Sequence, residues 1–161
     1  MNLKSSFLLV FLLFLMISCD EKRVFDEYKT VGNQWIKDSI VSFNFKQTDT
    51  TKNYNLFVNI RNNEEYEFNN LFLIVALQHP NGVIKIDSLQ YEMTRPDGSF
   101  LGEGFTEIKE NKLIYKEKVK FSKPGLYKLT IQQAIRKTGK INGLESLQGI
   151  TEVGFRIESL Q

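Results

Sequence analysis

The chain has 161 residues, enough for one domain, with a formal charge of +2, one Cys and one His. This charge balance excludes a generally basic surface for nucleic acid. The single Cys and single His exclude a disulfide framework and a metal site built from several such side chains. Residue chemistry therefore says more about location and shape than about activity, and we expect no nucleic-acid partner and no cofactor.

Residues 1–18 have the features of a secretory signal peptide. Lys4 precedes an unbroken apolar run over residues 7–17. This run is too short for a membrane-spanning helix, which needs about 20 residues, but it has the length of a signal-peptide core. The sequence turns polar at Asp20 and Glu21, and we expect cleavage after residue 18.

The residues around Cys19 resemble a bacterial lipobox. An apolar pair and Ser18 precede the only Cys of the chain, although Met16 stands where Leu is usual. The resemblance implies lipidation of Cys19 by palmitate-type chains and a permanent anchor, because two or three acyl chains hold a protein stably in a membrane. The alternative is an ordinary signal peptide with an incidental Cys. We expect an extracytoplasmic envelope protein, with the choice of inner or outer membrane open.

Residues 19–28 read as a lipidated tether that leads to the folded domain. Asp20 and Glu21 look like the acidic export signal of some Bacteroidota lipoproteins. A solvated tether of mixed charge is the alternative, and the residues themselves leave both open.

The remaining chain, residues 29–161, has the composition and periodicity of β-structure. Ala occurs only at positions 76 and 134, which disfavours helices. A continuous apolar run over 71–77 predicts a central strand covered on both sides, linked to a strand over 83–93. Apolar and polar residues alternate with a period of two, typical of strands with one buried face, over residues 41–45, 54–60, 115–121, 127–135 and 151–157.

Turn signals separate these runs. Pro80-Asn81-Gly82 predicts a hairpin, and Pro96-Asp97-Gly98 and Lys123-Pro124-Gly125 predict further turns. Residues 138–149 break the pattern and read as a loop with one helical turn at 144–147. The whole predicts one all-β domain, an antiparallel β-sandwich of about eight strands, jelly-roll-like rather than immunoglobulin-like.

Residues with catalytic or metal-binding potential are scarce. His79 is the only candidate general base, and we expect it as an ordinary surface residue at a hairpin tip. Asp97, Glu103 and Glu107 lie close in sequence but have no metal-site spacing. We therefore predict no catalytic residues, no metal site and no enzyme.

Two further features leave alternatives open. The tripeptides that begin at Asp38, Asp49 and Asp87 match a Bacteroidota O-glycosylation pattern, with Ser39, Thr50 and Ser88 as acceptors, but Asp followed by Ser or Thr is also common in turns. Aromatic side chains could stack on sugar rings if exposed or pack in the core. These are Trp35, Tyr54, Tyr66, Tyr91, Tyr115 and Tyr127.

The mature chain resembles the GldH gliding-motility lipoproteins of Bacteroidota. The resemblance is carried by residues 19–28, 35–40, 54–62, 69–73 and 149–158, and it covers essentially the whole mature chain. It implies an envelope lipoprotein needed for gliding, without known enzymatic activity, that acts with other proteins of the gliding machinery. The alternative function is a carbohydrate-binding surface lipoprotein.

Overall fold

The computed structural model describes residues 22–136, 139 and 142–160, and these residues form strands and connections without a helix. Within this part of the chain there is accordingly no helix that could cross a membrane. The strands are β1 (Arg23–Thr30), β2 (Gln34–Ile36), β3 (Val41–Gln47), β4 (Tyr54–Asn62), β5 (Asn70–Gln78), β6 (Ile84–Glu92), β7 (Lys109–Val119), β8 (Gly125–Gln133), β9 (Ser146–Gln148) and β10 (Ile150–Ser159).

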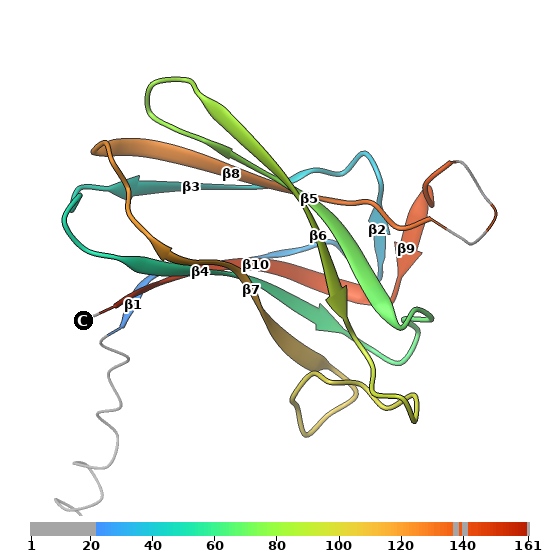
Figure 1. Ribbon diagram of the computed structural model, residues 1–161. Coiled ribbons are helices and arrows are strands. Elements are labelled where there is room, and N and C mark those ends of the chain that lie inside the picture. The colour runs from blue at the N-terminus through green and yellow to red at the C-terminus, as the bar shows by residue number, and fades with distance from the viewer. Residues whose placement is uncertain (1–21, 137–138, 140–141, 161) are drawn as a thin grey trace, which may run out of the picture.

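Two four-stranded antiparallel sheets face each other in Figure 1. One has the order β1-β10-β4-β7 and the other the order β3-β8-β5-β6, while β2 and β9 form a separate short pair. When the short pair is left out, this is the strand order of a jelly roll. The predicted all-β sandwich and its jelly-roll character are confirmed, with ten strands rather than about eight.

The expected tether does not extend to residue 28, because β1 already begins at Arg23. This strand pairs with β10 from Arg23 opposite Glu158 to Thr30 opposite Glu152. Phe25 packs its ring 5.7 Å from the rings of both Phe45 and Phe155. A strand was not expected here because charged residues occupy half of its positions, which is tolerated at the edge of a sheet.

The helical turn expected at 144–147 is also replaced by a strand. β9 pairs with β2, so that Leu147 lies opposite Trp35, and both side chains are fully buried. The indole Nε1 of Trp35 donates a hydrogen bond to the Ser39 carbonyl at 2.8 Å. The short pair therefore closes one end of the sandwich over its only Trp.

β5 is central, as predicted, but it is covered on one side only. Leu71, Leu73, Val75 and Leu77 are buried between the sheets, whereas Ile74 on the opposite side is exposed. A continuous apolar run does not separate a doubly covered strand from one that places small or apolar residues on a solvent face.

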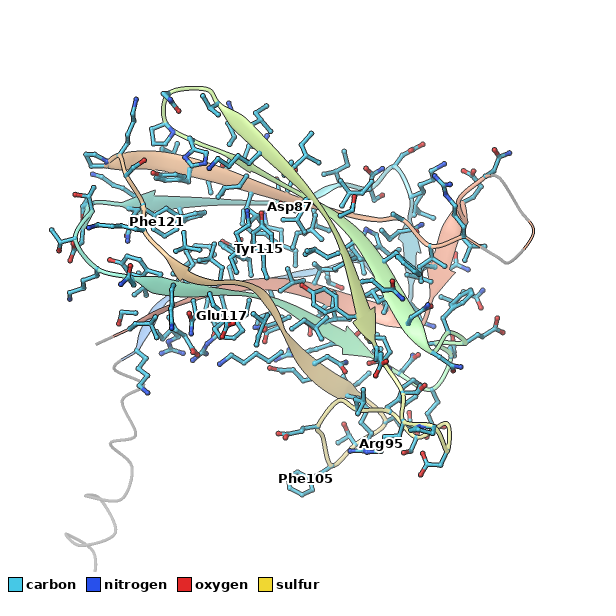
Figure 2. The ribbon with its side chains drawn as sticks, in the orientation of Figure 1. Asp87, Arg95, Phe105, Tyr115, Glu117 and Phe121 are labelled. Atoms are coloured by element: carbon cyan, nitrogen blue, oxygen red, sulfur yellow. The ribbon has the colours of Figure 1, made fainter. Side chains whose placement is uncertain are left out.

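Aromatic rings fill the other end of the core. Phe45 stacks on Tyr127 with ring centroids 5.4 Å apart, and Phe121 meets Tyr127 edge-on at 5.0 Å. Figure 2 shows Phe121 between the two sheets. Such pairs contribute about 0.5–1.5 kcal/mol each beyond the area they bury.

The three predicted turns are present, and each contains a Gly residue with a positive φ angle. Gly82 has φ +82° at the tip that joins β5 to β6, and Gly98 has φ +85° in the connection from β6 to β7. The main chain of His79 closes the β5–β6 hairpin through hydrogen bonds with Val83 and Gly82. The Lys123-Pro124-Gly125 turn enters β8.

Candidate interaction surface on the β1-β10-β4-β7 sheet

The residues predicted for modification lie apart from one another. Cys19 lies outside the described residues. Ser39 is exposed in the connection from β2 to β3, and Ser88 is exposed on the edge strand β6. Thr50 is half-buried in the β3–β4 connection, where Asp49 Oδ1 accepts hydrogen bonds from both the amide and the hydroxyl of Thr51. Asp49 therefore has a turn-forming role, and glycosylation of all three positions stays a prediction.

His79 is not the freely exposed tip residue that was expected. Its ring is half-buried and meets Tyr127 edge-on at 5.3 Å. Burial, together with the charges of Lys85 and Lys116, lowers the pKa of His79 below its usual value. Its imidazole is thus neutral near pH 7 and serves as part of the core boundary.

Asp97, in the β6–β7 connection, forms a turn. Asp97 Oδ1 accepts hydrogen bonds from the amide and hydroxyl of Ser99, and these bonds lower the pKa of Asp97. Among the described residues, no group of His, Cys, Asp and Glu has an arrangement that could hold a metal ion.

The aromatic residues do not form a sugar-binding platform. Trp35, Tyr54, Tyr66, Tyr115 and Tyr127 are all buried in the core. Tyr91 is half-buried, and its hydroxyl donates a hydrogen bond to the Ile114 carbonyl on β7. The carbohydrate-binding alternative therefore loses the observation that motivated it.

The most organised surface is the outer side of the β1-β10-β4-β7 sheet. Alternate positions of its four strands carry charged and aromatic side chains that contact one another across the sheet. We call this surface the charged face and define it by Asp26, Tyr28, Phe57, Asn59, Arg61, Glu110, Lys112, Glu152, Gly154, Arg156 and Glu158.

Arg61 on β4 is the centre of one half of the charged face. Its Nε lies 2.9 Å from Glu110 Oε2 on β7, and its Nη1 lies 2.6 Å from Glu152 Oε2 on β10. The guanidinium also lies 4.2 Å from the centre of the Tyr28 ring. The hydrogen bonds to Glu152 and Glu110 raise the pKa of Arg61 further above its usual value, so the side chain stays charged.

Tyr28 reaches across β10 to the two strands beyond it. Its hydroxyl donates to Glu110 Oε1 at 2.8 Å and accepts from Asn59 Nδ2 at 2.9 Å. The ring crosses β10 over Gly154, where a Cβ atom would lie 2.8 Å from two ring carbons. Burial and the hydrogen bond to Glu110 raise the pKa of Tyr28, so its phenol stays protonated.

A second set of ion pairs covers the other half. Arg156 contacts Asp26 at 2.8 Å and Glu158 at 2.6 Å, and Lys112 contacts Glu158 at 2.7 Å. Lys112 also lies 4.2 Å from the centre of the Phe57 ring. Burial alone would raise the pKa of Glu158, but the hydrogen bonds from Lys112 and Arg156 outweigh it and lower the pKa.

This chemistry suits recognition rather than acid–base catalysis. Tyr28 holds its proton, Arg61 holds its charge, and the carboxylates accept hydrogen bonds from fixed donors. A general base needs a pKa near the working pH, and neither Tyr28 nor Arg61 is tuned in that direction. The charged face therefore presents hydrogen-bonding groups in fixed positions.

Sequence reasoning did not find the charged face. Asn59 and Arg61 were visible as polar residues alternating with a buried set, but alternation does not reveal which strands become neighbours. Tyr28 and Glu110 are 82 residues apart in sequence and meet only through the order β1-β10-β4-β7.

Comparison with known proteins gives the family. The model of the family described as GldH lipoprotein matches residues 23–157. The chain belongs to the GldH lipoprotein family. The "Gliding motility lipoprotein GldH" of Flavobacterium johnsoniae is 58% identical over 158 residues, which cover 98% of each chain. The "Gliding motility lipoprotein GldH homolog" of Christiangramia forsetii is 52% identical over 154 residues, or 96% of this chain and 94% of the relative.

Membership in the GldH family confirms the resemblance that was identified from five segments between residues 19 and 158. It also confirms a lipid-anchored location in the cell envelope. Solved structures are less similar. A GH115 4-O-methyl-alpha-glucuronidase matches 89% of this GldH chain and 18% of its own, with 13% identity and a TM-score of 0.48. Latent PorU from Porphyromonas gingivalis matches with 10% identity and a TM-score of 0.38. Likeness at this level says nothing about a substrate or a partner.

Proposed function

We propose that the protein is a non-enzymatic, lipid-anchored component of the gliding machinery and acts by contacting other proteins of that machinery. The observation that carries this proposal is the match to a gliding-motility lipoprotein over nearly the full length of both chains. A match of this extent includes both sheets and every strand of the charged face, so the relative shares the whole domain.

Lipidation of Cys19 is the anchor in this proposal. Its support is the sequence before it, an apolar run followed by a small residue and the only thiol of the chain. Two or three acyl chains attach a protein stably to a membrane, and a protein without acyl chains is released from it. The protein would then act from a membrane surface and meet partners that assemble at the same surface.

A clean gene deletion, complemented by variants, tests this function. Cells without the gene should fail to spread on agar, and the wild-type gene should restore spreading. Cys19→Ala should leave the protein in the soluble fraction and fail to restore spreading, whereas Asn81→Ala, a matched change of a small exposed polar residue, should restore it. Normal spreading of the deletion strain would contradict the proposal.

The contact with partners has its own test. Tagged protein, gently solubilised from membranes, should enrich other gliding proteins over the Cys19→Ala control. We assign the charged face to this contact because its groups are held in fixed positions. Glu110→Gln with Glu152→Gln should weaken the enrichment. Glu64→Gln with Glu67→Gln, exposed residues between β4 and β5, is the matched control and should leave the enrichment unchanged.

A further inference from the structure

The folded domain begins very close to the proposed lipid. The carbonyl of Lys22 already accepts a hydrogen bond from the Ser159 amide at 2.8 Å, so Lys22 is fixed against the end of β10. Only Asp20 and Glu21 separate Lys22 from Cys19. Three residue steps of extended chain span about 10 Å at most. A lipidated Cys19 therefore holds this end of the sandwich against the headgroups.

Strand register shows which segments share that end. Arg23 lies opposite Glu158, Ser159 opposite Tyr54, and Tyr54 opposite Val119. The β3–β4 connection (48–53) and the β7–β8 connection (120–124) join this end of one sheet to the same end of the other. Figure 1 shows these two connections on the side of the molecule where the C-terminus lies.

Cationic side chains predominate at this end, which we call the basic end. It includes Lys22, Arg23, Lys46, Lys52, Lys118, Lys120 and Lys123, all exposed. The carboxylates of the described residues here are Asp49, which forms the turn and lies 3.9 Å from Lys52, Glu117, and Glu158, which is paired with Lys112 and Arg156.

The opposite end has the reverse character. Its connections carry Asp38, Glu64, Glu65, Glu67, Asp97, Glu103, Glu107 and Glu145, against Lys37, Arg95 and Arg136 among the described residues. Phe105 projects there from the β6–β7 connection, fully exposed (Figure 2). The described part of the chain is thus polarised along its strands.

We propose that the basic end docks on an anionic phospholipid surface, so that the sandwich stands upright on the membrane. This inference rests on the lipidation of Cys19 proposed above. Each Lys or Arg close to such a surface strengthens binding on the order of fivefold. The nine residues of β4 then raise the opposite, acidic end of the sandwich and Phe105 about 30 Å above the headgroups.

Hydrogen–deuterium exchange of the full lipidated protein on vesicles tests the docking. One set of vesicles contains roughly one third phosphatidylglycerol in phosphatidylethanolamine, and the other contains only zwitterionic lipid. On anionic vesicles the amides of residues 48–53 and 120–123 should exchange at least about fivefold more slowly than on neutral ones. The protection should disappear in about 1 M salt, where the Debye length is ~3 Å.

Charge reversal supplies the matched variants. Lys52→Glu, Lys120→Glu and Lys123→Glu combined should abolish the protection. The same charge change at the opposite end, Lys37→Glu, Lys109→Glu and Arg136→Glu combined, should preserve it.

Flotation of the same samples separates the two proposals. Protein that does not float with vesicles lacks the anchor, which refutes the lipidation of Cys19 and the docking together. Protein that floats but exchanges freely at residues 48–53 and 120–123 keeps its anchor and refutes the docking alone. Equal protection on neutral and anionic vesicles, or protection only in membranes that contain other gliding proteins, would also overturn it.

Discussion

Gly154→Ala offers a direct test of how the charged face is held together. A Cβ atom at position 154 would lie 2.8 Å from two carbons of the Tyr28 ring and 3.1 Å from the Asn59 Cβ. The ring must therefore lift from β10. Its hydroxyl would then lose the bonds to Glu110 and Asn59, and the contact with the Arg61 guanidinium would lengthen.

The size of the effect follows from these contacts. Each hydrogen bond contributes about 1 kcal/mol to stability and the cation–π contact about 0.5–1 kcal/mol. Alanine recovers about 0.5–1 kcal/mol relative to glycine, because it restricts the unfolded chain more. We expect Gly154→Ala to lower the free energy of unfolding by about 2 kcal/mol, which lowers Tm by roughly 6–8 °C for a domain of this size.

A double-mutant cycle with Tyr28→Ala is the assay. Urea unfolding gives the free energy of each variant, and Gly154→Ala should change it by less than about 0.5 kcal/mol once the ring is gone. Gly143→Ala is the matched control, because its Cβ would meet other atoms at 3.4 Å or more. An equal loss with and without the Tyr28 ring would refute the reasoning.

Three further predictions concern stability. Gly149→Ala should prevent stable folding, because its φ is +80° and its Cβ would overlap the Tyr66 backbone, whereas Gly82→Ala, with φ +82° in open space, should cost only about 1–2 kcal/mol by urea unfolding. Trp35→Ala should cost about 3–5 kcal/mol and lower Tm accordingly, and a loss under 1 kcal/mol would contradict the packing seen around this ring. The pKa of Glu158 is lowered in the folded state, so its contribution is present above about pH 4.5 and is lost as pH falls through the lower folded pKa. Glu158→Gln should therefore cost about 1–2 kcal/mol at pH 7, and the urea midpoints of variant and wild type should converge as the pH falls below that range.

The long strands could be predicted from sequence because the side chains on the inward side of each are nearly all apolar. In β3 the inward positions include Val41, Phe43 and Phe45, and these alternate with exposed or half-exposed residues. The pattern depends only on the period of two and so needs no knowledge of neighbouring strands. The same is true of turns, because Gly82 and Gly98 are required by local geometry.

The strands that were not predicted, β1, β2 and β9, lack this period-two pattern for identifiable reasons. The inward positions of β1 are Phe25, Glu27 and Lys29, and only the first is apolar, so an edge strand reads as a polar tether. β2 and β9 have three residues each, too few for any period to appear. Trp35 and Leu147 are buried through their pairing with each other, a contact across 112 residues that no local pattern contains.

The charged face could not be predicted for a related reason. Outward residues such as Arg61 and Glu152 have the same appearance in sequence whether water or a neighbouring side chain solvates them. Strand order decides between the two, and the order β1-β10-β4-β7 is a property of the whole chain. The basic end could be predicted only in part. Its lysines are visible in each connection of the sequence, but strand order decides that these connections lie at the same end of the sandwich.

The position of β10 determines when the domain can fold. This last strand lies between the first strand and β4, and its Val153, Phe155 and Ile157 supply the centre of one sheet. Until residues 150–159 are available, β1 has no partner and an edge of β4 is open. Synthesis, and any passage through a membrane from the N-terminus, therefore delivers an unfolded chain almost to its end, and folding proceeds as a single late event dominated by distant contacts.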